Sequence, residues 1–111
     1  MNSIDPITEE AVRRFLGLIR ERYDVAGAIL YGSRARGTHS RDSDADVAVL
    51  LKGELEWFND QKAMSGIAFD VMLETGILIS PLPLRLDDWE HPENYSNPEL
   101  LHNIELEGIR I

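Results

Sequence analysis

The chain contains no cysteine, which excludes disulfide bonds and thiolate metal sites. This absence fits a reducing compartment, and we expect a cytoplasmic protein. Long apolar runs are also missing: runs such as 47–51 are far too short to cross a bilayer, and residues 1–5 do not begin a signal peptide. Repeats, low-complexity tracts and linkers are not found. We therefore expect one domain, 1–111, that makes no membrane contact.

Basic residues are scarce after position 41. Residues 1–41 carry seven basic and five acidic side chains, whereas residues 42–111 carry four and fifteen, which together give the formal net charge of -9. Because an acidic surface repels phosphates, we expect no direct binding of nucleic acid. The charge suits a basic protein partner, and simple solubility explains it equally well.

The apolar pattern predicts an α/β (α+β) fold, a small mixed sheet flanked by helices. The predicted helices are 6–23, 54–65 with Gly66 at the end, and 98–107, and the predicted strands are 25–31, 46–51 and 67–74. Leu82, Leu84 and Leu86 alternate, but the neighbouring prolines restrict them to an edge strand or an extended segment.

A glycine–serine step, Gly32-Ser33, follows the strand predicted at 25–31, and the helix-forming triplet Arg34-Ala35-Arg36 follows that step. A strand that runs through glycine into a helix start leaves backbone N–H groups unpaired in one place, where phosphate oxygens bind well. The serine hydroxyl adds a donor, and glycine allows close approach to the backbone. Taken alone, the two residues are more often an ordinary turn than a phosphate site.

Two aspartates, Asp44 and Asp46, alternate at the start of the next predicted strand. Alternation places both on one face, roughly 7 Å apart at the backbone. Such a pair repels and raises the pKa of its members unless a cation lies between them. Two carboxylates with substrate phosphates are a usual ligand set for Mg²⁺, whereas an ordinary polar strand edge is the simpler interpretation. A calcium loop that also uses Asp42 is excluded, because the glycine and glutamate of that pattern are missing.

A third acid, Asp70, interrupts the apolar strand predicted at 67–74. An unpaired carboxylate on a half-buried strand is costly, so Asp70 needs a partner. If this strand neighbours 46–51, Asp70 converges with Asp44 and Asp46 on one cation; the alternative is an ion pair with a nearby arginine.

Three carboxylates around Mg²⁺, opposite a serine-bearing turn, form a phosphoryl-transfer site. In such a site the metal ions neutralise the triphosphate and Asp70 accepts the proton of the attacking hydroxyl. Arg34 and Arg36 are candidates to hold the departing pyrophosphate, although solvated helix arginines are the alternative.

The order of these motifs resembles the polymerase β-like nucleotidyltransferase superfamily: Gly32-Ser33, ten residues, Asp44-Ala45-Asp46, then an isolated acid in a later apolar strand. In detail, Gly32-Ser33-Arg34-Ala35-Arg36-Gly37 with Ser43-Asp44-Ala45-Asp46 is similar to the minimal nucleotidyltransferase (MNT) branch, the antitoxin half of HEPN–MNT toxin–antitoxin pairs. The resemblance covers residues 25–74.

This resemblance implies a palm-like mixed sheet, two Mg²⁺ ions and ATP as the donor. It implies transfer of AMP to a tyrosine hydroxyl of a HEPN toxin partner, with which the chain would form a hetero-oligomer. By motif match, Gly32 and Ser33 would hold the triphosphate, while Asp44, Asp46 and Asp70 would be the catalytic metal ligands.

Two alternatives remain beside AMP transfer to a protein. One is a catalytically idle domain of the same fold that neutralises a partner by binding alone. The other is nucleotidyl transfer to a small molecule, which is disfavoured because residues 75–111 are too few for a second, acceptor-holding domain.

Overall fold

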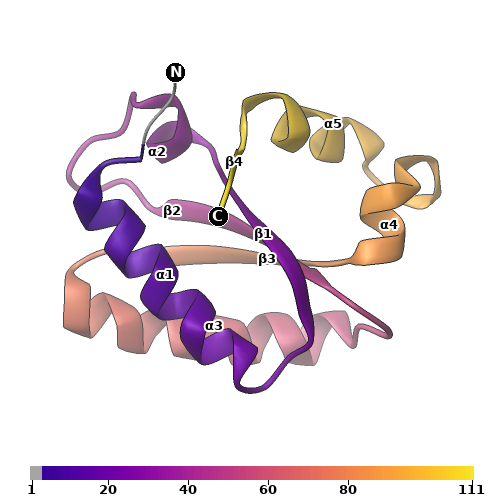
Figure 1. Cartoon of the computed structure of the whole chain (residues 1–111), viewed down its shortest axis with the longest axis horizontal. Coiled ribbons are helices and arrows are strands. Elements are labelled where there is room, and N and C mark those ends of the chain that lie inside the picture. Colours follow the sequence, from indigo (N-terminus) through magenta and orange to yellow (C-terminus); the bar gives the residue numbers. More distant parts are fainter. Residues whose placement is uncertain (1–3) are drawn as a thin grey trace.

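A four-stranded mixed sheet organises residues 4–111, the part of the chain that the computed structural model describes; the first three residues of the predicted domain lie outside it. Its elements in chain order are α1 (Pro6–Arg20), β1 (Val25–Tyr31), α2 (Ser33–Arg36), β2 (Ala45–Leu51), α3 (Trp57–Thr75), β3 (Ile79–Arg85), α4 (Leu86–Glu90), the 3-10 turn η1 (Pro92–Asn94), α5 (Pro98–Glu107) and β4 (Ile109–Arg110). Helices flank the sheet as predicted (Figure 1), which confirms the α+β fold class.

The strands lie in the order β3-β2-β1-β4. β1 pairs antiparallel with both β2 and β4, whereas β2 and β3 are parallel. Parallel neighbours need a crossover connection, and helix α3 provides it between β2 and β3 (Figure 1).

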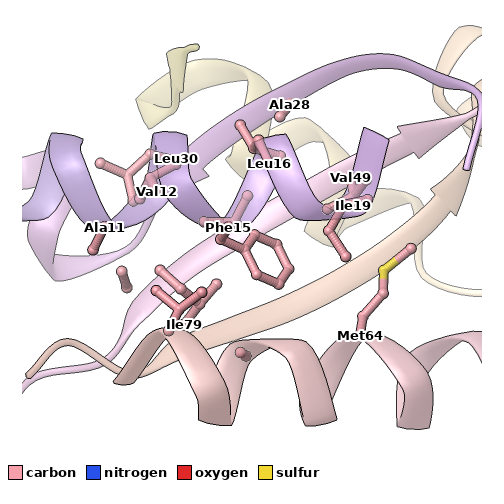
Figure 2. Packing of buried hydrophobic residues seen from close by; sticks show 14 of the residues in the cluster. Ala11, Val12, Phe15, Leu16, Ile19, Ala28, Leu30, Val49, Met64 and Ile79 are labelled. Atoms are coloured by element: carbon pink, nitrogen blue, oxygen red, sulfur yellow. The ribbon is translucent and has the colours of Figure 1, made fainter. Parts of the chain in front are cut away.

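The two faces of the sheet bury different side chains. One face packs against α1 and α3 through a large apolar cluster that includes Phe15, Leu30 and Met64 (Figure 2). The opposite face packs a smaller cluster, around Leu50 and Ile104, under α4 and α5. Within residues 4–111, no helix has both the length and the apolar character to cross a membrane.

The region predicted as a helix at 54–65 and a strand at 67–74 is one continuous helix, α3, so that prediction is wrong. Its buried residues are Met64, Ala68 and Val71, which recur at helical spacing. Gly66 does not end the helix; Gly76 does, with a φ of 81° and an N–H that donates to the Met72 carbonyl. Apolar residues that alternate over a few positions can satisfy either period, and here the helical one is correct.

The strand beside β2 is instead β3, which contains two prolines. It lies at the edge of the sheet, where one side of the strand has no ladder to complete and a missing N–H is tolerated. The extended segment predicted around Leu82 and Leu84 is therefore confirmed, and it supplies the third strand that the sequence interpretation had assigned to 67–74.

Candidate functional site

The turn between β1 and α2 brings the backbone of Gly32 against the side chain of Asp46. Gly32 has a φ of 75° and a ψ of -159°, a conformation open essentially to glycine alone. A Cβ on this residue would overlap Oδ2 of Asp46 and lie 3.3 Å from its Cγ. The carbonyl of Gly32 accepts hydrogen bonds from Ala35 and Arg36, which fixes the start of α2. The predicted Gly32-Ser33 turn and the predicted Asp46 therefore form one site.

Three adjacent strands contribute one row of side chains to this site. Asp46 on β2 pairs with Tyr31 on β1 and with Ser80 on β3. All three belong to the face that carries the smaller cluster, because the preceding residue on β2, Ala45, is buried in the larger cluster on the opposite face. The sequence interpretation missed Ser80 because it did not identify β3 as the neighbour of β2.

The carboxylate of Asp46 is held in unfavourable surroundings. Burial raises its pKa above the ordinary value of 3.8, the negative charge of Asp44 raises it further, and Arg36 lowers it in part. The predicted repulsion between the two motif carboxylates is therefore present. A cation bound between them would remove the repulsion and favour the ionised form of Asp46.

Tyr31 lies beside Asp46 on the neighbouring strand. Burial, followed by the charge of Asp46 and the nearby Tyr95, raises the pKa of Tyr31 to about 12. Its hydroxyl therefore stays protonated at neutral pH and is available as a hydrogen-bond donor rather than as an anion.

Asp44 lies at the exposed rim of the site, immediately before β2. It borders a cavity of about 240 Å³ whose other lining residues include Met72, Gly76 and Leu78. The carbonyl of Leu78 accepts a hydrogen bond from Ala45, 2.9 Å long, so the end of α3 and the aspartate motif are held together.

Asp70 does not join the other two acids, and its predicted role as a metal ligand and proton acceptor is not supported. It lies on α3, exposed, and α3 covers the sheet face opposite to the one that carries Asp46. Within the described part of the chain, no three acidic or histidine side chains are grouped so that they could hold a metal ion. The predicted trio is thus a pair, Asp44 and Asp46, and the described residues do not fit the predicted pair of ions.

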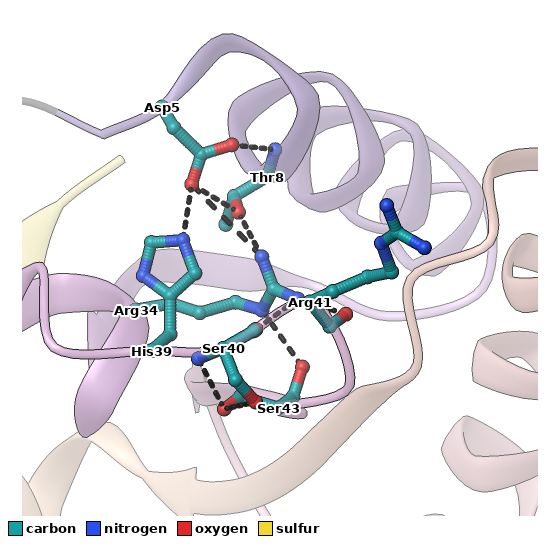
Figure 3. Close-up of polar contacts among 7 residues, drawn as sticks. All are labelled: Asp5, Thr8, Arg34, His39, Ser40, Arg41 and Ser43. Carbon is teal, nitrogen blue, oxygen red and sulfur yellow. Dashed lines mark hydrogen bonds and ion pairs between the residues drawn. The ribbon is translucent and has the colours of Figure 1, made fainter.

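The sequence predicts that Arg34 contacts the nucleotide, but in the structure its guanidinium makes internal hydrogen bonds instead. Its side chain is buried, with 4% of the residue exposed. Its Nε donates to the Ser43 carbonyl at 2.8 Å and its Nη1 donates to the Thr8 hydroxyl at 2.8 Å. Nη2 donates to the carbonyl of Arg41 at 3.1 Å (Figure 3). A guanidinium so fully engaged is a structural anchor for residues 37–44, which lead to the aspartate motif.

The same anchor reaches the start of α1. Asp5 caps this helix by accepting from the Thr8 backbone at 3.0 Å and from its hydroxyl at 2.6 Å. The His39 Nε2 lies 3.1 Å from Asp5 Oδ2, and Nη1 of Arg34 lies 3.9 Å from it (Figure 3). The long-range contacts of Asp5 with residues 34 and 39 carry no signal in the sequence.

Arg36, by contrast, stays near the site. Its side chain is half exposed and pairs with Glu107 at 3.1 Å, and its charge acts on Asp46. Arg36 is therefore the better candidate of the two arginines for contact with a phosphate. Ser33, at the turn, remains a second candidate for such a contact.

Replacing Arg34 with methionine is expected to lower the free energy of unfolding by about 2–4 kcal/mol, because the Thr8 hydroxyl and three backbone carbonyls lose a buried charged donor. The matched control is Arg36→Met, which removes an exposed arginine two residues away and should cost less than about 1 kcal/mol. Urea unfolding followed by circular dichroism measures both. Equal losses would contradict the anchoring role.

Residues 12–97 match the family described as "Nucleotidyltransferase domain", a span that includes the turn and both motif aspartates. A candidate protein adenylyltransferase of Methanocaldococcus jannaschii is 33% identical over 76 residues, which cover 68% of this chain and 74% of that protein. The crystal structure of a candidate nucleotidyltransferase from Sulfolobus solfataricus superposes with a TM-score of 0.50 at 20% identity, covering 82% of this chain and 84% of its own. This last likeness concerns the fold alone.

Proposed function

Because this chain belongs to the nucleotidyltransferase domain family, we propose that it transfers AMP from ATP to a hydroxyl group of a partner protein, with the help of Mg²⁺. The observation that carries the proposal is the contact between the Asp46 carboxylate and the Gly32 turn. It brings a cation ligand against a backbone that can approach phosphate oxygens closely. The relative from Methanocaldococcus jannaschii, which is named for protein adenylylation, supports the same class of acceptor.

In the proposed reaction, the hydroxyl oxygen of the acceptor forms a bond to the α-phosphorus of ATP. The bond from that phosphorus to the bridging oxygen breaks, pyrophosphate leaves, and the hydroxyl proton passes to water. The backbone at Gly32 and the hydroxyl of Ser33 orient the triphosphate, and Arg36 offers a charge to the departing pyrophosphate.

Asp44 and Asp46 would hold the cation. Two carboxylates completed by phosphate oxygens suit a hard divalent ion. The pKa of Asp46 is raised partly by the charge of Asp44, and a cation bound between the two carboxylates would relieve that repulsion. When bound, Mg²⁺ neutralises phosphate charge and polarises the α-phosphate.

The proposed acceptor is a tyrosine of a HEPN-type toxin, whose silencing would make this chain an antitoxin. Two features support a protein acceptor. Leu78, which lines the Asp44 cavity, is 36% exposed, and α3, which contributes Met72 to the same lining, carries two further exposed apolar side chains one turn apart, Phe69 (53%) and Leu73 (68%). The acidic charge of the chain also suits a basic partner.

A second candidate function is neutralisation of a partner by binding alone. The observation that favours it is the missing third carboxylate: the described residues group only Asp44 and Asp46 at the site. A domain that retained nucleotide binding but not transfer would show this arrangement.

The two functions are separated by incubating the protein with Mg²⁺, its neighbour-encoded partner and ATP labelled at the α-phosphate. Transfer of AMP predicts label on the partner, and a parallel reaction with γ-labelled ATP should leave the partner unlabelled. The Asp44→Asn, Asp46→Asn double variant should abolish the labelling. Neutralisation of the partner that survives in this double variant, with no label on the partner in the wild type, would favour the binding function instead.

A further inference from the structure

The position beside Asp46 on the neighbouring strand is occupied by a serine. β2 and β3 are parallel, and Ser80 pairs in register with Asp46 on the same face of the sheet. Backbones so paired lie about 4.8 Å apart, so two side chains there can reach one ion. The whole of β3, with the sequence ISPLPLR, carries no acidic residue.

The chemistry of this position differs between a serine and an acid. A carboxylate beside Asp46 and Asp44 would add a third negative charge to the site. Two divalent cations bridged by carboxylates need this third charge, because it offsets part of their positive charge. A serine offers one neutral oxygen, which is a weak ligand for a hard cation. A further acid at position 80 would lie directly beside Asp46 on the neighbouring strand, so its negative charge would be unfavourable without a second ion.

We infer that Ser80 limits this site to one divalent cation, held by Asp44, Asp46 and the phosphates of the nucleotide. The inference rests on the proposed nucleotide site but does not depend on the transfer reaction. Ser80 is thus a residue that determines the metal stoichiometry, and a single substitution to an acid there should create a second ion site.

The test is a count of Mn²⁺ ions, by electron paramagnetic resonance, bound to the full chain in the presence of a non-hydrolysable ATP analogue. The wild type should bind one Mn²⁺ per chain and Ser80→Asp should bind two. Ser80→Asn is the matched control, because it has the size of aspartate without its charge, and it should bind one.

Stability provides a second measurement that needs no nucleotide. Ser80→Asp should melt at a lower temperature than Ser80→Asn in the absence of metal, because its carboxylate lies beside Asp46. Mn²⁺ should raise the melting temperature of Ser80→Asp more than that of Ser80→Asn or the wild type. A larger response of this kind supports the inference even if Ser80→Asp is only marginally folded at room temperature.

Two ions on the wild-type chain, or none, would overturn the inference, as would equal ion counts and equal Mn²⁺ responses for Ser80→Asp and Ser80→Asn. The proposed function fails separately, in the label-transfer assay. A wild-type chain that binds one ion but transfers no label would support the inference and contradict the proposed enzymatic function. A wild-type chain that binds two ions and transfers label would contradict the inference and support the enzymatic function.

Discussion

Replacing Asp46 with asparagine is expected to abolish nucleotidyl transfer while raising the melting temperature of the metal-free protein at neutral pH. Transfer should fall by about 1000-fold or more, because a cation ligand that stabilises transition-state charge contributes several kcal/mol. Stability should rise because the native carboxylate is buried next to Asp44 and its ionised form is disfavoured. The proposed cation ligand is therefore retained at a cost to the stability of the fold.

The stability difference between the wild type and Asp46→Asn is expected to depend on pH. The pKa of Asp46 in the folded protein is raised above 3.8, so the folded state holds this proton more tightly than the unfolded state does. Stability due to Asp46 is then greatest in acid, where both states are protonated, and falls as pH rises through the raised pKa. The melting temperatures of wild type and Asp46→Asn should therefore converge in acid and diverge toward neutral pH.

Asp42→Asn is the control, because Asp42 is an exposed acid two positions before the motif pair. It should leave transfer within about threefold of the wild type and should not show the same divergence with pH. Adding Mg²⁺ with ATP should raise the melting temperature of the wild type and of Asp42→Asn, but much less that of Asp46→Asn. An Asp46→Asn variant that melts below the wild type at neutral pH would show instead that Arg36 holds the ionised form.

The parts of the site that were predictable are those that a short, continuous stretch of sequence defines by itself. The strand 25–31, the turn at Gly32 and the strand predicted at 46–51 were confirmed, because each is defined by its own apolar run and punctuating glycine or aspartates. The start of the last helix, predicted at residue 98, was confirmed for the same reason: the Asn97 side chain accepts a hydrogen bond from the Leu100 backbone as a local cap.

The absence of a third carboxylate from the site was not predictable, because it depended on which segment lies beside β2. The run 67–74 alternates well enough to predict a strand, and only its packing against α1 and β3 shows the helical period of Met64, Ala68 and Val71. Prolines 81 and 83 lowered the apparent strand character of the true neighbour, although the edge of a sheet tolerates them. Register between distant strands carries no local signature, so Ser80 could not be found.

The two arginines of the motif show the same limit at the level of side chains. Arg34 and Arg36 have one environment in the sequence, a short helix after a glycine. Two positions on a helix differ by about 200° in direction, so one side chain enters the protein toward Thr8 and the other faces Glu107. Burial separates their roles, and burial is a property of the whole fold.

Substitution of Gly32 by alanine is the second change with a large expected effect. Its φ of 75° with a ψ of -159° lies in a region that residues with a Cβ rarely adopt, and the added methyl would overlap the Asp46 carboxylate. We expect a loss of about 2–4 kcal/mol in the free energy of unfolding. Nucleotidyl transfer should fall by about 100-fold, since displacing a catalytic group by about 1 Å can have that effect.

Gly37→Ala supplies a matched control for Gly32→Ala. Gly37 also has a positive φ, 78°, but its ψ of 16° is the ordinary left-handed region and a Cβ there would meet no atom within 4 Å. Its loss of stability should be about 1 kcal/mol, from backbone strain alone. A Gly32→Ala variant as stable as Gly37→Ala would show that the backbone at Gly32 relaxes freely.

A double-mutant cycle isolates the contact between Gly32 and Asp46. In an Asp46→Ala background the carboxylate is gone, so Gly32→Ala should lose only the backbone part of its cost. The difference between the two backgrounds, measured by urea unfolding in the absence of metal, is the free energy of the clash. Since the site depends on this backbone lying against this carboxylate, a coupling near zero would mean that the turn and the aspartate motif are positioned independently, and the proposed joint hold on cation and triphosphate would lose its structural basis.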